Sequence, residues 1–472
     1  MNDMRKIVCF LIALLGFTKV AAQDPADFVL PSIISDHAVM QRNATVKLWG
    51  WCPSVWDLKI VCSWAPNDTI HAKSDKLKYW EAFIDTPKEE GPYTIKFYGW
   101  ENKLFAEVKD ILMGETWLCS GQSNMEYCFR WRVDDIKDRT NFFDNKKIRF
   151  FQVNKSSSAY PVERIQGEWK IASLDNIEDF SVVAYCFGKQ LNAGLDNAPV
   201  GLIGSYWGGT GIEPWMESFM LHHENLDKLA DKIEPSWAPT AKSSLYNAMI
   251  YPIINYTFKG VIWYQGEANN ERASDYGVLF DNMIRGWRNA THRYLPFYFV
   301  QIAPWNGYAD KNAAYLREQQ ADVAATLRNT GMVVVSDLVN DISDIHPSLK
   351  RQVGERLANL ALKQTYHKAD LNPFSPMLKS FKVEKNKVIV TTTAVGKLSC
   401  KDKEIKHFEI VDKDGNLHPA QAVILKNGDI AVSAKGVKVP TGVRYCFTND
   451  AMPNVFDVNG LPLAPFRTDR SK

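Results

Sequence analysis

The sequence predicts an α/β protein in which a central α/β/α domain with a parallel sheet is flanked by amino-terminal and carboxyl-terminal β-sandwich-like domains. Apolar and polar residues alternate with a period of two near both ends of the chain. In the middle, strand-length apolar runs alternate with helix-length amphipathic segments. A length of 472 residues suits about three domains. The expected boundaries are 23–108, 109–368 and 369–472, after an amino-terminal segment 1–22.

The amino-terminal domain is predicted to be a small antiparallel sandwich over roughly 28–107. Val46 and Leu48 alternate with polar neighbours, and Ile95 and Phe97 do the same further along. A period of two places such residues on one face of a strand, where they meet a core.

The central domain shows the alternation expected of a parallel sheet covered on both faces. The predicted strands are Trp117–Ser120, Ile148–Val153, Val200–Tyr206, Gly260–Tyr264, Phe297–Ile302 and Met332–Ser336. The predicted helices are Ser181–Ala193, Ser244–Ile254, Ser274–Arg288, Ala313–Leu327 and Leu349–Tyr366. Ligands of such sheets bind beyond the carboxyl ends of the strands, so functional residues are expected in the loops there.

From about Asn372 the period returns to two, which predicts a second β domain. Asp414-Gly415 and Asn427-Gly428 are typical hairpin turns between its strands. The alternating pairs are Phe381/Val383, Val388/Val390, Phe408/Ile410 and Ile430/Val432.

Composition excludes several function classes. The formal net charge is only +2 and no long basic run is present, so we expect no nucleic-acid partner. No metal-ligand spacing such as HxxxH is present, so we expect no metal and no other cofactor. The 15 Trp, 18 Tyr and 24 Phe suit sugar-facing surfaces and large β cores equally well. The oligomeric state is left open by the sequence.

The first residues have the pattern of a secretory signal. Arg5 and Lys6 precede the apolar run 7–17, and Val20-Ala21-Ala22 offers small residues before a cleavage point. The apolar run is too short to span a bilayer. We therefore expect a secreted or periplasmic protein with no membrane insertion after cleavage.

Ser123 is the candidate nucleophile. It follows the apolar run 115–120 in the segment Gly121-Gln122-Ser123-Asn124-Met125, so its hydroxyl is expected at the carboxyl edge of the sheet. A serine in this position is by itself more often a helix cap. His346, within Asp344-Ile345-His346-Pro347, changes that balance, because a serine and a remote histidine are what nucleophilic acyl transfer requires.

Four loops that follow predicted strands carry the polar residues. They are 121–124, 207–215, 263–269 and 343–347. Each loop alone is more simply explained as turn chemistry, in which glycines adopt left-handed conformations and a histidine begins a helix. Four such loops at one edge of a sheet are hard to explain by chance.

The sequence resembles the sialate O-acetylesterases of the SGNH (GDSL-like) hydrolase superfamily over nearly the whole mature chain. One departure is Tyr251, where the family usually has a histidine. The matching segments are Leu30–His37, Met40–Arg42, Glu115–Met125, Leu245–Ile250, Leu316–Gln319, Asp344–Pro347 and Gly460–Asp469. The resemblance implies an SGNH-like domain that removes O-acetyl groups from sugars, typically sialic acid, through an acyl-serine intermediate.

The resemblance agrees with the roles expected from the residues. Ser123 attacks the acetyl carbonyl, and His346 takes its proton and passes it to the sugar oxygen. The oxyanion would be held by the Ser123 N–H, by the N–H of Gly209 in preference to Gly208, and by a side-chain amide. Superfamily logic places that amide in the third loop. The candidate amides are those of Gln265 and Asn269, and Gln122 is a further candidate for substrate binding.

The carboxylate that orients His346 has two candidates. The superfamily's usual acid lies three residues before the histidine, where this chain has Ser343. Asp344 lies only two residues before, so a strand-like geometry would turn it away from the imidazole. Glu267 in the third loop is the alternative, and a Ser-His dyad without an acid is a third arrangement. Asp344 is slightly favoured, because it shares a short loop with the histidine.

Other functions compete with this prediction. An esterase for another acetylated polysaccharide such as xylan would have the same loops. An inactive carbohydrate-binding relative is a different class, although the presence of both Ser123 and His346 argues against it. A peptidase would need a peptide-binding cleft, which nothing in the chain specifies.

Overall fold

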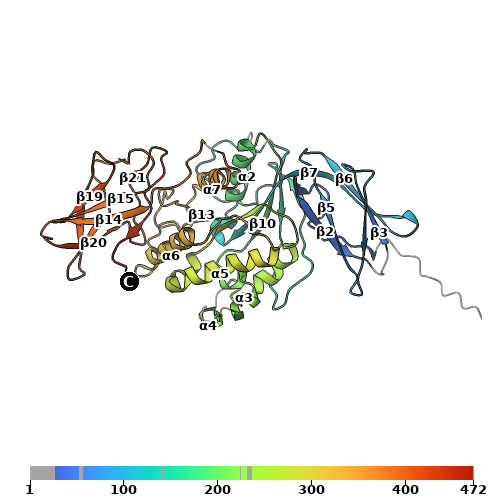
Figure 1. The fold of residues 1–472 in the computed structure, drawn as a ribbon, viewed down its shortest axis with the longest axis horizontal. Coiled ribbons are helices and arrows are strands. Elements are labelled where there is room, and N and C mark those ends of the chain that lie inside the picture. The colour runs from blue at the N-terminus through green and yellow to red at the C-terminus, as the bar shows by residue number, and fades with distance from the viewer. Residues whose placement is uncertain are drawn as a thin grey trace, which may run out of the picture.

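The computed structural model describes residues 27–52, 57–139, 142–143, 145–223, 225–230, 237–368 and 370–470. The expected signal segment 1–22 lies outside these residues. Three domains follow one another along the longest axis of the molecule, with the α/β domain between two β domains (Figure 1). The predicted fold class is thereby confirmed. In the described part of the chain, no helix has the length and apolar character needed to cross a membrane.

The amino-terminal domain packs a two-stranded sheet, β2 with β5, against a second sheet formed by β3, β4, β6 and the start of β7. Trp80 of β5 and Phe97 of β6 join the sheets, with ring centroids 5.8 Å apart. Val46, Leu48 and Ile95 are also buried, as their alternation predicts. The strands are β1 Val39–Gln41, β2 Thr45–Trp51, β3 Asp57–Cys62, β4 Thr69–Lys73, β5 Tyr79–Asp85, β6 Tyr93–Tyr98 and β7 Leu104–Gly121.

β7 belongs to two domains at once. Its first half pairs with β6 of the amino-terminal domain, and its second half is the central strand of the parallel sheet. The boundary expected at residue 108 therefore falls inside a continuous strand. The two domains share this strand and are not joined by a linker.

The central sheet has the strand order β13-β12-β11-β7-β10-β8-β9. All neighbouring pairs are parallel except β8 with β9, which forms an antiparallel edge. The strands beside β7 are β8 Ile148–Gln152, β9 Trp169–Ile171, β10 Val200–Tyr206, β11 Gly260–Tyr264, β12 Phe297–Val300 and β13 Thr330–Val333. Each of the six predicted strands has a counterpart, because the apolar runs are buried on both faces of the sheet, although β13 at Thr330–Val333 is displaced toward the amino terminus from the predicted Met332–Ser336.

Helices cover both faces of this sheet. α2 packs on α7 on one face, and α5 packs on α6 on the other (Figure 1). The helices are α1 Ser123–Glu126, α2 Val182–Gly194, α3 Ser218–His223, α4 Asp227–Ala230, α5 Ala273–Thr291, α6 Asn312–Thr326 and α7 Lys350–Gln364. Two separate clusters of buried residues lie above and below the sheet, which is the α/β/α arrangement predicted.

The helix predicted over Ser244–Ile254 is present but irregular. It departs from a regular α-helix, because after Ser244 and Leu245 it forms a π-helical turn, Tyr246–Ile250, followed by a 3₁₀ turn, Tyr251–Ile253. Pro252 explains the difference, because it lacks an N–H to donate and its ring clashes with the carbonyl four residues earlier. The apolar pattern of the segment arises from burial, since Met249, Ile250 and their neighbours lie in the core.

The carboxyl-terminal domain is a sheet of order β14-β15-β19-β18-β17-β20-β22, with β16 and β21 paired separately. The two predicted hairpin turns join β17 to β18 and β18 to β19. Phe381 and Val383 differ from the other alternating pairs, since both are about two-fifths exposed on the edge strand β14. The strands are β14 Leu378–Glu384, β15 Lys387–Thr392, β16 Ser399–Cys400, β17 Phe408–Asp412, β18 Leu417–Ile424, β19 Ile430–Ser433, β20 Pro440–Tyr445, β21 Val455–Phe456 and β22 Phe466–Arg467.

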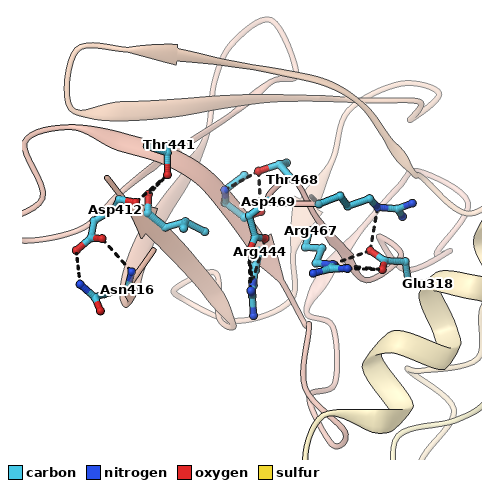
Figure 2. Close-up of polar contacts among 11 residues, drawn as sticks. Glu318, Asp412, Asn416, Thr441, Arg444, Arg467, Thr468 and Asp469 are labelled. Carbon is cyan, nitrogen blue, oxygen red and sulfur yellow. Dashed lines mark hydrogen bonds and ion pairs between the residues drawn. The ribbon is translucent and has the colours of Figure 1, made fainter. Parts of the chain in front are cut away.

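Charged residues join the carboxyl-terminal domain to α6. Arg467 donates from Nε and Nη2 to the carboxylate of Glu318, which is nearly buried, and Arg470 approaches the same carboxylate at 2.9 Å. Figure 2 shows Arg467 reaching from its strand toward Glu318 on α6, with the Arg444–Asp469 pair beside it. A partly buried, bidentate pair of this kind fixes orientation as well as contributing energy.

Asn449 makes several polar contacts between the two domains. Its amide nitrogen donates to the three carbonyls of residues 308–310, and its amide oxygen accepts from the N–H of Ala313 at the start of α6. Its own carbonyl accepts from the N–H of Trp305. The Trp305 indole in turn donates to the carbonyl of Ser343 at 3.0 Å, in the loop that contains His346.

Replacing Asn449 with alanine is expected to lower the free energy of unfolding by about 3 kcal/mol, because it leaves several buried groups without partners. Urea denaturation followed by tryptophan fluorescence measures the change. Asn459→Ala, at an exposed turn of the same domain, is the control and should stay within about 0.5 kcal/mol of the parent chain. An equal loss in both variants would contradict the assignment.

Candidate active site

The register of three neighbouring strands brings the loops together. Tyr206, the last residue of β10, and Tyr264, the last residue of β11, both lie opposite Gly121 at the end of β7. The loops that follow these strands therefore leave the sheet at the same level. The loop that contains His346 lies between β13 and α7 at the same edge, and a hydrogen bond links it to the nucleophile loop.

The backbone before Ser123 is held tightly against β11. Gly121 has φ +142°, and a Cβ there would lie 2.1 Å from the carbonyl oxygen of Tyr264, so only glycine fits. Gln122 donates its N–H to that carbonyl, and its side-chain oxygen accepts from the N–H groups of Gly266 and Ala268. Gln122 thus ties the third loop to the nucleophile loop.

Ser123 and His346 meet across 223 residues of sequence. The Nε2 of His346 lies 2.9 Å from the Oγ of Ser123, within hydrogen-bond distance. Burial lowers the pKa of His346 below its ordinary value, and the nearby charge of Lys350 lowers it further, whereas Asp344 acts in the opposite direction. The imidazole is therefore predominantly neutral at neutral pH, as a general base must be.

The two candidate acids differ in their contacts with His346. Asp344 places Oδ1 3.9 Å from the Nδ1 of His346 and accepts the backbone N–H of His346 at 2.8 Å. It therefore acts on the imidazole by charge and fixes the turn, with no direct hydrogen bond to Nδ1. Glu267 is buried and accepts from the amide of Asn124 at 2.6 Å, and it makes no hydrogen bond to His346.

The two glycines of the second loop have different roles. The N–H of Gly208 donates to the carboxylate of Glu126 at 2.6 Å, so it is already used. The N–H of Gly209 has no hydrogen-bond partner among the described residues. Gly209 has φ +76°, and a Cβ there would lie 2.4 Å from the ring of Trp237. The structure thus leaves the N–H of Gly209, the glycine preferred from the sequence, available to a ligand.

Gln265 and Asn269 differ from the expected oxyanion donors. The amide nitrogen of Gln265 donates to the Asn269 side chain at 2.7 Å and to the carbonyl of Thr210. The amide nitrogen of Asn269 donates to both carboxylate oxygens of Glu213, which pairs with Arg272. Both amides are buried and neither makes a hydrogen bond to Ser123 or His346. They hold the second and third loops together because their donors are satisfied there.

Three further residues near the pair received no role from the sequence. Asn124 and Lys350 are buried behind Ser123 and bond to each other. Trp131 lies beside His346, with ring centroids 5.9 Å apart, and is 41% exposed. Asn124 belongs to the nucleophile motif itself, which is a signal for a role. No sequence signal points to a role for Lys350 or Trp131, because a single lysine or tryptophan is common on helices and in loops.

The sequence matches a known family over the part of the chain that contains this site. The profile described as "Carbohydrate esterase, sialic acid-specific acetylesterase" matches residues 113–363, more than half of the chain. The chain belongs to this family. Carbohydrate O-deacetylation, the activity class predicted from the sequence, is therefore confirmed, and the substrates of this class are O-acetylated sugars.

Individual relatives agree with the family over almost the full length. The sialate O-acetylesterase of Pongo abelii is 28% identical over 485 residues, covering 93% of this chain and 92% of the relative. The sialate O-acetylesterase of Homo sapiens is 28% identical and covers 81% of this chain and 80% of its own length. A carbohydrate acetylesterase from Xanthomonas citri is 32% identical in sequence. Its crystal structure superposes with a TM-score of 0.84 and covers 94% of this chain and 100% of its own.

Replacing Asp344 with asparagine is expected to lower kcat for a soluble acetyl ester about tenfold, because a negative charge beside the imidazole is lost. Asp341→Asn is the matched control. Asp341 lies in the same loop, but it accepts from Ser343 and not from His346. Equal rates for the two variants would show that the carboxylate of Asp344 does not assist His346.

Proposed function

We propose that this chain is a sialate O-acetylesterase that removes O-acetyl groups from sialic acid through an acyl-serine intermediate. The observation that carries the mechanism is the 2.9 Å contact between Ser123 and His346 in a chain of this family. The names of the relatives from Pongo abelii and Homo sapiens support sialic acid as the substrate.

The reaction proceeds in two halves. His346 takes the proton of the Ser123 hydroxyl as the oxygen attacks the acetyl carbonyl, and the sugar leaves with that proton on its oxygen. The acetyl group then remains on Ser123 as an ester. Water, deprotonated by His346, attacks this ester, and acetate leaves as Ser123 regains its proton.

Backbone N–H groups stabilise the oxyanion in this proposal. The N–H groups of Ser123 and Gly209 have no hydrogen-bond partner among the described residues, which leaves them available to a carbonyl oxygen. Gln122 is the side-chain candidate, because its oxygen is bound by two N–H groups and its amide nitrogen has no partner in the described chain. Each such donor typically contributes about 3 kcal/mol to transition-state stabilisation.

Trp131 gives the sugar a surface next to the histidine. Its ring is partly exposed and meets the His346 ring edge to face. The apolar face of a pyranose packs on an exposed indole, while the acetyl group reaches the serine. Trp131 is therefore the proposed contact for the ring of the acetylated sugar.

We place this reaction outside the cytoplasm, in the secreted or periplasmic fraction. The support is the signal pattern of the sequence, with Arg5 and Lys6 before an apolar run and Val20-Ala21-Ala22 before the expected mature chain. A protein purified from the extracellular or periplasmic fraction should therefore begin near Gln23, which amino-terminal sequencing reads directly.

The substrate proposal is tested by acetate release from O-acetylated sialosides and from acetylxylan. Faster release from the sialosides is expected, with Ser123→Ala lowering the rate about a thousandfold or more, since no second nucleophile replaces the hydroxyl. A preference for acetylxylan would favour the alternative polysaccharide substrate. An unchanged rate in Ser123→Ala would exclude the serine mechanism, and no release from any substrate would favour an inactive relative.

The pH profile follows from the lowered pKa of His346. Since the base works only when neutral, activity is present above the pKa of the histidine and is lost as the pH falls through it. The shift below the ordinary value of 6.5 places the acidic limb of kcat/KM below that pH. A profile of kcat/KM on a soluble acetyl ester checks this, and an acidic limb centred above 6.5 would contradict it.

A further inference from the structure

A buried polar cluster adjoins the Ser123–His346 pair through Asn124 and Ile345 and takes no part in the proposed chemistry. It consists of Asn124, Glu267 and Lys350, each at most 3% exposed. These residues come from three different places, namely helix α1, the turn after β11 and the first position of α7. Buried polar groups are costly unless they are paired, so a cluster of three calls for an explanation.

The amide of Asn124 joins all parts of the cluster. Its nitrogen donates to the carboxylate of Glu267 at 2.6 Å and to the carbonyl of Ile345 at 3.1 Å. Its oxygen accepts from the Nζ of Lys350 at 2.5 Å. Ile345 immediately precedes His346, so one side chain adjacent to the nucleophile also holds the peptide that carries the base.

Lys350 carries a buried amine with no carboxylate within ion-pair distance among the described residues. The rings of Tyr127 and Tyr264 lie 4.8 and 5.4 Å from its Nζ. Burial lowers the pKa of Lys350 to about 7, against the more distant charges of Glu267, Asp344 and Asp135, which raise it. The charged form of such an amine is expensive to bury, which favours a role beyond stability.

Glu267, like Lys350, is a buried ionisable residue with few hydrogen-bond partners. Only one of its carboxylate oxygens, Oε1, has a hydrogen-bond partner, and Oε2 is buried without one. Burial raises the pKa of Glu267, and the positive charge of Lys350 acts in the opposite direction. The carboxylate and the ammonium group thus affect each other's protonation across the amide of Asn124.

The cluster reaches the imidazole in two ways. The bond from Asn124 to the carbonyl of Ile345 fixes the backbone on the amino-terminal side of His346. The positive charge of Lys350 disfavours a second positive charge on His346, in opposition to Asp344. Lys350 lies four residues after the histidine, at the start of a helix whose packing on α2 holds it in place.

We propose that Asn124, Glu267 and Lys350 are positioning residues that hold His346 against Ser123 and place a positive charge behind the imidazole. This inference rests on the proposed esterase function. It assigns to Glu267 a role other than the orienting acid, because the carboxylate acts through Asn124 and Lys350 and not on the histidine itself.

The test compares variants of Lys350 by their pH profiles. Lys350→Met removes the charge and the hydrogen bond, whereas Lys350→Gln removes the charge and keeps an N–H donor. In both, the acidic limb of kcat/KM should move up by roughly half a pH unit, because His346 loses a cation that lowers its pKa. In Lys350→Met, kcat should also fall about tenfold or more with KM little changed, since the base is less well positioned. Lys350→Gln should retain more of kcat.

Arg351→Met is the matched control on the same helix. Arg351 is the next residue and also a cation, but it is half exposed and pairs with Glu355 on the helix surface. Its replacement should leave both kcat and the pH profile unchanged. Glu267→Gln is a further variant, which keeps an acceptor for Asn124. The acidic limb of kcat/KM should move to higher pH in this variant too, as in the Lys350 variants. The reason is that losing the carboxylate favours the neutral form of Lys350.

The outcomes separate this inference from the proposed function. Melting temperatures identify which of the Lys350 and Glu267 variants fold. The pH profile of kcat/KM of any folded variant then tests the positioning role. If Ser123→Ala abolishes acetate release but the folded Lys350 and Glu267 variants behave like Arg351→Met, the positioning role is wrong and the esterase function stands. If the parent chain releases no acetate, the proposed function fails first.

Discussion

The shared level at which β7, β10 and β11 end is the constraint on which the site depends. Because Gly121, Tyr206 and Tyr264 lie opposite one another, the loops after these strands begin side by side. A shift of one residue in either pairing would turn every side chain of that strand to the other face. The close contact of Gly121 with the Tyr264 carbonyl reinforces this register, since only glycine permits it.

Much of the fold could be predicted from the hydrophobic pattern of the sequence and from its turn residues. The strands of the central sheet are buried on both faces, so they stand out as apolar runs, and the hairpin turns stand out by Asp-Gly and Asn-Gly. The segment 244–254 shows a limit of this reasoning, because the apolar pattern predicts a helix without separating π-helical and 3₁₀ turns from a regular α-helix, and only Pro252 indicates the irregularity. The shared strand β7 was equally hidden, since periodicity does not show which sheet a strand joins.

The reacting groups of the candidate site could be predicted from the sequence. The buried polar residues that hold those groups in place could not. Ser123 and His346 each belong to a distinctive motif, and the fold brings them within hydrogen-bond distance. The side-chain amides were harder to assign, because an amide has the same appearance in sequence whether it faces a ligand or a loop. The amide groups of Gln265 and Asn269 donate to Asn269 and Glu213 inside the protein, and the sequence does not indicate these partners. The same limit applies to Lys350, whose burial depends on contacts with distant loops.

The contact of Asn449 with Trp305 also bears on how far this protein is modular. A carboxyl-terminal β domain of this kind looks as if it could be replaced without affecting the central domain. Here its Asn449 carbonyl holds the backbone of Trp305, whose indole holds Ser343, three residues from the histidine. The carboxyl-terminal domain therefore helps to hold the loop that contains His346 in place. A grafted replacement domain would have to place a backbone carbonyl at the position of the Asn449 carbonyl to keep Trp305, and through it Ser343, in place.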